Sequence, residues 1–264
     1  MSAVEISRLN AQIKAITHLI DNSDDFIRGL IEVIKMYSNR AYRLGEEVRM
    51  DTLIPSYKLP PVVMQQLESE VSILAKKNPQ KALNIAKQLW NKRHLELKLL
   101  AVVIISSLPN NLSKTAIQIL KSWLEIQEDK NITQAILDKA SALFKKESLE
   151  KWADVIKTWL ENESIEKQKL GIYAICNLIR NESYKNMPRI FKMLKPLFIN
   201  PLLPLQQGLK DVIYELRNKS ETETISFLRM IIQSTKNPST LLFVRRSITE
   251  FSSDIQSDLR NLME

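Results

Sequence analysis

The sequence predicts an all-α protein in which antiparallel helix pairs repeat along the chain. Residues 89–108 have the pattern of a helix end, a short polar turn and a second helix that is apolar almost all round. A degenerate copy follows 70 positions later, at residues 159–178, and aligns Glu96 with Glu166. Because 70 is twice 35, we expect a unit of about 35 to 40 residues, which is typical of HEAT and armadillo repeats. The predicted fold is a HEAT-like α-α superhelix, a solenoid of antiparallel helix pairs.

Composition agrees with a helical fold and restricts the kinds of site. The 264 residues include 4 glycines and 10 prolines, too few for an all-β fold with many hairpins. The single cysteine, Cys176, excludes a disulfide framework and a cysteine-based zinc site, and it suits a cytoplasmic location. We expect no signal peptide, and the longest strongly apolar run, residues 99–105, is too short to span a membrane.

Apolar spacing divides the chain into three parts. Residues 1–44 are expected to form an N-terminal helical pair, because apolar side chains recur at intervals of three and four over 4–20 and again over 26–43. Residues 45–61 contain three prolines and are expected to be a loop. Residues 62–264 are expected to form one continuous superhelix. Its predicted helices are 61–76, 79–90, 94–108, 113–127, 132–146, 149–161, 164–181, 187–199, 202–218, 222–234, 239–252 and 254–262.

Positive charge is concentrated in the C-terminal third. The formal net charge is +8, and residues 185–246 carry 11 basic and 4 acidic side chains, whereas the rest of the chain carries 27 and 26. Such a patch attracts polyanions, namely nucleic acid, an acidic membrane surface or an acidic protein. Cations on successive helices of one concave wall would track a phosphate backbone. The candidate binding residues are Arg189, Lys192, Lys195, Lys210, Arg217, Arg245 and Arg246.

Three local patterns distinguish the chain from a generic helical repeat. A short motif that ends in proline, Tyr57-Lys58-Leu59-Pro60, precedes a helix, and Leu89-Trp90 is followed by His94-Leu95-Glu96. The helix predicted at 132–146 has an apolar face and a polar stripe that includes Asp138. Together these patterns resemble the AlkD-like DNA alkylation repair family, whose members are HEAT-like superhelices. The resemblance covers roughly residues 57–263.

The resemblance implies binding of duplex DNA on a basic concave face and excision of N3- or N7-alkylated purines. Asp138 takes the position of the family's acid and is the candidate catalytic residue, where a carboxylate would stabilise positive charge on the sugar. Lys169 keeps one of two family cations and is a candidate DNA contact. Gln134 and Asp211 stand where the family has tryptophans, so the sequence leaves open whether glycosylase activity survives.

The alternative is a non-catalytic HEAT-like scaffold that binds an acidic protein partner or nucleic acid. The four tryptophans mostly lie near helix ends with leucine neighbours, which favours packing over contact with bases. Neither histidine has the spaced partners of a metal or nucleophilic site, and no nucleotide-binding fingerprint is present. We therefore expect a monomer without cofactor, metal or membrane association, with duplex DNA as its leading partner.

Overall fold

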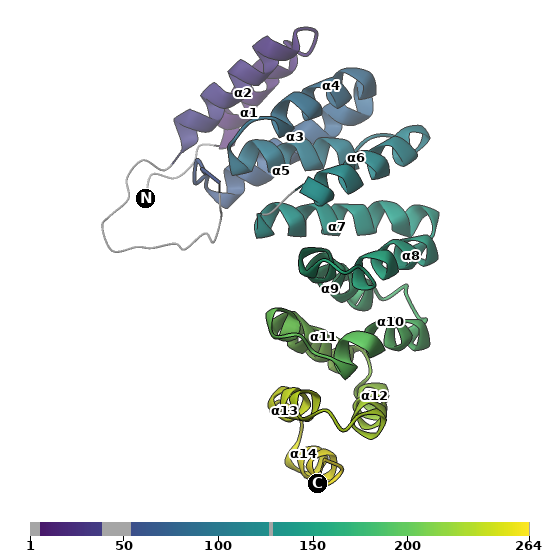
Figure 1. The fold of residues 1–264 in the computed structure, drawn as a ribbon. Coiled ribbons are helices and arrows are strands. Elements are labelled where there is room, and N and C mark those ends of the chain that lie inside the picture. The colour runs from purple at the N-terminus through teal and green to yellow at the C-terminus, as the bar shows by residue number, and fades with distance from the viewer. Residues whose placement is uncertain (1–5, 39–53, 127–128, 264) are drawn as a thin grey trace, which may run out of the picture. The chain divides into compact units, whose positions relative to one another are not determined.

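The computed structural model describes residues 6–38, 54–126 and 129–263 (Figure 1). Every regular element in these residues is a helix, with fourteen α-helices and two short 3₁₀-helices. Consecutive helices fold back on each other, most extensively α4 on α5 and α8 on α9. The predicted all-α fold of HEAT-like helix pairs is therefore confirmed. The chain forms two compact units, Met1–Leu143 and Phe144–Glu264.

The first unit contains α1 to α6 and most of α7. α1 packs against α3 and α3 against α5, while α2 packs against α4 and α4 against α5 (Figure 1). The bounds are α1 Ile6–Thr17, α2 Ser23–Tyr37, α3 Pro61–Lys77, α4 Pro79–Trp90, α5 Leu95–Ser106, η1 Asn110–Leu112, α6 Ser113–Ile126 and α7 Lys130–Glu147. α5 is apolar all round because it lies against α3, α4 and α6, and nine of its twelve residues are buried.

No single helix in the described ranges has the length and apolar character needed to span a membrane. The segments Leu95–Ser106 and Asn110–Ile126 meet that requirement only when taken together, and the chain bends by 107° between them.

The second unit has two rows of helices. α8, α10, α12 and α14 pack in sequence to form one row, and α9, α11 and α13 form the other, which we call the α9–α11–α13 row (Figure 1). The bounds are α8 Leu149–Leu160, α9 Ile165–Arg180, α10 Met187–Ile199, η2 Leu203–Leu205, α11 Gln206–Lys219, α12 Glu221–Ser234, α13 Pro238–Ser247 and α14 Ser253–Asn261.

Two glycines allow the helices around α9 to approach closely. A Cβ on Gly171 would lie 2.8 Å from a methyl group of Leu160 and 3.0 Å from its backbone nitrogen. A Cβ on Gly208 would lie 2.8 Å from a methyl group of Ile172. Both contacts are shorter than van der Waals packing permits, so these positions set the spacing of α8 and α11 against α9.

Most helix boundaries agree with those predicted from the sequence, and three predicted helices differ from the structure. The helices predicted at 79–90 and 187–199 coincide with α4 and α10. Asp129 supplies the capping oxygen of α7, which therefore begins at Lys130, two residues earlier than predicted. The helix predicted at 202–218 is divided into η2 and α11. The helix predicted at 239–252 is too long, because α13 ends at Ser247 and a turn follows.

The predicted division of the chain at residues 45–61 stays a prediction. Residues 39–53 lie outside the described part, and with them the end of the expected helical pair and most of the expected loop. In the described part, α2 is joined to α4 by a hydrogen bond of 3.1 Å from Asn84 Nδ2 to Ser23 Oγ. Lys81 and Asp21 form an ion pair between the same segments. The N-terminal helices thus pack on the repeats that follow.

Candidate functional site

The segment before α3 is held by a buried carboxylate. Glu96 is only 4% exposed, and it accepts hydrogen bonds from Ser56 Oγ at 2.6 Å, Tyr57 N at 3.0 Å and Lys58 N at 2.9 Å. The Tyr57 ring stacks on His94 with centroids 4.2 Å apart. Burial raises the pKa of the Tyr57 hydroxyl above its ordinary value, and the charge of Glu96 raises it further. These contacts give the motif Tyr57-Lys58-Leu59-Pro60 an anchoring role.

The tryptophans pack between helices, as their positions predict. Trp90 of α4 stacks on Trp123 of α6 with centroids 4.1 Å apart, and Trp152 meets Trp159 edge to face. All four are buried, with exposed fractions of 7% or less. None of them can therefore stack on a base without rearrangement of the core.

Asp138 lies on the exposed side of α7. Its neighbours Ile136, Leu137 and Ala140 are buried in the first unit, so the helix presents the carboxylate away from the core. Gln134, one turn earlier, donates a hydrogen bond from Nε2 to Asp138 Oδ1 at 2.9 Å. The position at which the resemblance leads us to expect a tryptophan therefore carries an amide that orients the candidate acid. An oriented carboxylate can stabilise a neighbouring positive charge.

Three candidate DNA contacts are occupied by carboxylates. Lys169 pairs with Glu166 at 2.9 Å and Arg217 with Glu250 at 3.6 Å. The Arg189 guanidinium forms ion pairs with both Glu150 and Asp154 of α8. Burial lowers the pKa of Arg189, but the hydrogen bonds to the two carboxylates outweigh this effect and raise it above the ordinary value. This arrangement ties α10 to α8, which is a structural role.

The other five candidate cations form no ion pair within the residues that the structure describes. They divide between the two rows of the second unit. Lys192 and Lys195 lie on α10, whereas Lys210 lies on α11 and Arg245 and Arg246 lie in the last turn of α13. The structure therefore does not place all the candidate cations on one row of helices.

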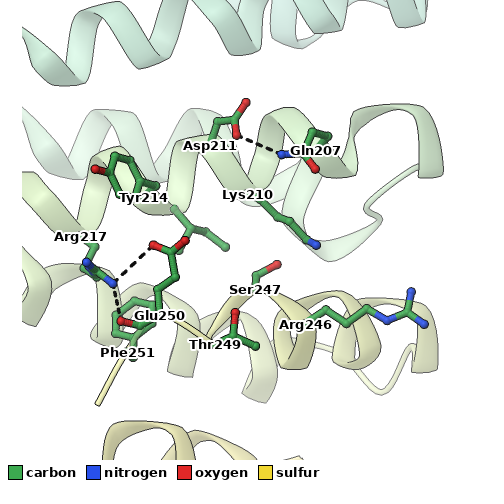
Figure 2. A pocket seen from close by; sticks show the side chains of 11 residues that line it. Gln207, Lys210, Asp211, Tyr214, Arg217, Arg246, Ser247, Thr249, Glu250 and Phe251 are labelled. Atoms are coloured by element: carbon green, nitrogen blue, oxygen red, sulfur yellow. Dashed lines mark hydrogen bonds and ion pairs between the residues drawn. The ribbon is translucent and has the colours of Figure 1, made fainter. Parts of the chain in front are cut away.

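A cavity of about 420 Å³ brings two of these cations together. It lies between α11, α13 and the turn after α13 (Figure 2). Lys210 and Arg246 are at one end, and Tyr214, Arg217 and Glu250 are at the other (Figure 2). The complete lining is Gln207, Lys210, Asp211, Ile213, Tyr214, Arg217, Arg246, Ser247, Thr249, Glu250 and Phe251.

Tyr214 is a cavity residue that was not predicted from the sequence. Its side chain is 48% exposed and lines the cavity one turn after Asp211, where the resemblance leads us to expect a tryptophan. Gln207, Lys210, Asp211 and Tyr214 are spaced by three and four residues, so they share one face of α11. That spacing, with an aromatic residue among polar ones, is the signal that identifies this face from sequence.

Metal ligands do not converge in the described residues, where no three His, Cys, Asp or Glu side chains form a group that could hold an ion. Cys176 is buried in α9, and loss of hydration raises the pKa of its thiol to about 12. The thiol therefore stays protonated at neutral pH and is a poor nucleophile.

Comparison with protein families gives a match that covers more than half of the chain. The sequence model for the DNA alkylation repair enzyme family matches residues 62–243, which run from α3 into α13. Comparison with curated proteins gives no match. The matched segment includes Asp138, Lys169 and Lys210, whereas Arg245 and Arg246 follow its end. The chain belongs to the DNA alkylation repair enzyme family.

Proposed function

We propose that the protein binds duplex DNA through the α9–α11–α13 row of the second unit. One observation carries the proposal: Lys210 and Arg246 come from different helices, line one cavity and form no ion pair with described residues. Membership of a DNA repair family supports DNA as the polyanion.

The pairing of each cation decides how readily it contacts a phosphate. A cation that already holds a carboxylate must release it first, as Lys169 and Arg217 would have to do on this row. Lys210 and Arg246 have no such pair in the described part of the chain. Their contacts with phosphates therefore release counterions from the DNA without first breaking an ion pair in the protein, which favours binding. Arg245 precedes Arg246 and therefore points about 100° away around the helix, outside the cavity lining.

A binding titration tests this proposal against an acidic protein partner. A fluorescent duplex is titrated with the full chain at low salt and again at moderate salt, and polyglutamate of similar charge serves as the competitor. We expect duplex binding that weakens steeply with salt and that polyglutamate displaces only at large excess. Absence of duplex binding at low salt would overturn the proposal, and equal affinity for polyglutamate would favour the scaffold that binds an acidic protein.

A second candidate activity, excision of alkylated purines, rests on Asp138. Its carboxylate is exposed, is oriented by Gln134 and forms no ion pair with described residues. Such a group is available to a cationic centre, and loss of a purine alkylated at N3 or N7 leaves positive charge on the sugar as the glycosidic bond breaks. Asp138 would stabilise that charge electrostatically.

A further inference from the structure

Only one wall of the cavity between α11 and α13 lies within the segment that the family model matches. Its α11 wall, from Gln207 to Arg217, lies within the matched segment that ends at residue 243. Its other wall, from Arg246 to Phe251, lies after that segment. Binding of a duplex backbone needs cations on a surface, but it does not need a cavity of about 420 Å³ with an aromatic ring.

We propose that this cavity binds a single nucleotide, with its phosphate at Lys210 and Arg246 and its base against Tyr214. The ligand class follows from the opposite character of the two ends, which Figure 2 shows on either side of the cavity. A volume of about 420 Å³ also falls within the range of roughly 300 to 1,000 Å³ that small-ligand sites occupy.

The end of the cavity at Lys210 and Arg246 has the chemistry of a phosphate site. Both side chains lack an ion pair within the described residues, and Arg246 offers a planar guanidinium that can hold two phosphate oxygens. At the opposite end the charge of Arg217 is balanced by Glu250. Asp211, the other carboxylate in the lining, accepts a hydrogen bond from Gln207 at 3.2 Å. The two cations without an ion pair to described residues therefore lie at one end, where the phosphate of a ligand would bind.

The opposite end has the chemistry of a base platform. The ring of Tyr214 is about half exposed, and Arg217 lies 6.0 Å from its centroid and 5.7 Å from that of Phe251. Arg217 also donates a hydrogen bond from Nη1 to the backbone oxygen of Glu250, so its position is fixed between the two rings. An exposed ring with a guanidinium beside it favours stacking of a nucleobase.

Hydroxyl groups lie between the two ends, where the sugar of such a ligand would sit. Ser247 donates its own proton to the backbone oxygen of Phe243 at 2.8 Å, so its oxygen remains an acceptor toward the cavity. Figure 2 shows Thr249 beside it on the same wall. A ribose or deoxyribose hydroxyl can donate to these oxygens.

The test is calorimetric titration of the full chain at low salt with deoxyadenosine monophosphate, deoxyadenosine or inorganic phosphate. The variants are Lys210→Ala, Arg246→Ala, Tyr214→Ala and Tyr214→Phe. The matched control is Lys236→Ala, because Lys236 is an exposed lysine outside the cavity lining. Thermal unfolding of each variant confirms that it folds, and Tyr214 is exposed enough for its loss to leave the core intact.

We expect deoxyadenosine monophosphate to bind at least about tenfold more tightly than either half of the molecule. Lys210→Ala and Arg246→Ala should each weaken binding about tenfold, and Tyr214→Ala about fivefold or more. Tyr214→Phe and Lys236→Ala should change it less than about twofold. The proposal is overturned if the nucleotide does not bind, if phosphate alone binds as tightly, or if Tyr214→Ala has no effect.

A competition experiment distinguishes a free nucleotide from a nucleotide within a strand. A short single-stranded deoxyadenosine oligonucleotide is added to the complex with deoxyadenosine monophosphate. Displacement that depends on Tyr214 supports a nucleotide of a DNA strand as the ligand, and no displacement supports a free nucleotide. Both results are independent of duplex binding, because Tyr214 is needed for the base platform and not for contact with the duplex backbone.

Discussion

The side chain of Gln134 donates a hydrogen bond to the carboxylate of Asp138 across 2.9 Å, one turn apart on α7. Both residues were singled out from sequence, Asp138 as a catalytic candidate and Gln134 as a departure from the family. Gln134, which stands where the resemblance leads us to expect a tryptophan, therefore orients the Asp138 carboxylate. Gln134 provides no aromatic surface for a damaged base, and we therefore predict that any excision activity depends on the Asp138 carboxylate.

Asp138→Asn tests that dependence. If the protein releases methylated purines from duplex DNA, loss of the negative charge should reduce release by at least about tenfold, because the amide cannot stabilise the cationic sugar. The measurement is chromatographic detection of the freed base, with Gln134→Ala as a second variant that loosens the carboxylate without removing it. Equal release of methylated purines by wild type and Asp138→Asn would show that Asp138 has no catalytic role. Absence of release by the wild type would remove the excision activity and leave duplex binding as the function.

Glu96→Ala should destabilise the protein, whereas Glu166→Ala should not. The two residues are equivalent in the sequence repeat, but Glu96 is buried with three hydrogen bonds and Glu166 is an exposed partner of Lys169. We expect losses in the free energy of unfolding of about 2 to 3 kcal/mol for Glu96→Ala and less than about 0.5 kcal/mol for Glu166→Ala. Denaturant unfolding measures both, and similar losses would contradict the anchoring role of Glu96.

Gly171→Ala should destabilise the second unit despite the higher helix propensity of alanine. The added Cβ would meet the backbone nitrogen of Leu160 at 3.0 Å, so α8 and α9 would have to move apart. We expect a net loss of about 1 to 2 kcal/mol. Gly29→Ala is the control, because the nearest atoms to its Cβ belong to side chains, those of Ile16 at 3.3 Å and Leu19 at 3.8 Å, and not to the backbone. A Gly171→Ala protein as stable as wild type would show that this helix contact is looser than the structure indicates.

Stability should fall at alkaline pH partly because of Cys176. Burial raises the pKa of its thiol from 9.0 to about 12 in the folded protein. Between these values the unfolded chain loses the thiol proton while the folded chain keeps it, so unfolding is favoured as pH rises. At about pH 10 the loss should be on the order of 1 kcal/mol relative to neutral pH. Unfolding curves of wild type and Cys176→Ala should therefore converge as pH rises from 8 to 10, and parallel curves would contradict the buried thiol.

The sequence predicted the helices well where local signals mark their ends. Pro79 follows an asparagine and begins α4, and Asn186 caps α10, so both helices have the expected bounds. The apolar pattern of residues 94–108 likewise reflects burial on all sides of α5. These features depend on residues close together in the chain, which is why periodicity and capping revealed them.

The cavity could not be predicted because it depends on where α13 ends and on contacts between distant residues. Residues 248–252 were expected to continue the helix, but Ile248 and Phe251 turn inward and are buried, and the turn they form becomes one wall. The pairing of Arg189 with Glu150 and Asp154 could not be predicted either, because these residues are 39 and 35 positions away in the sequence. Counting cations in the sequence therefore overstated the number available to DNA.

The salt dependence of duplex binding measures whether Lys210 and Arg246 contact the phosphates of the duplex. The full chain is compared with two double variants of equal charge, Lys210→Ala with Arg246→Ala on the α9–α11–α13 row, and Lys192→Ala with Lys195→Ala on α10. The logarithm of the association constant is plotted against the logarithm of salt concentration. We expect the first double variant to reduce the magnitude of the slope by about 2 and the second to leave it unchanged. Equal slopes for wild type and the Lys210/Arg246 variant, or a loss confined to the Lys192/Lys195 variant, would contradict it.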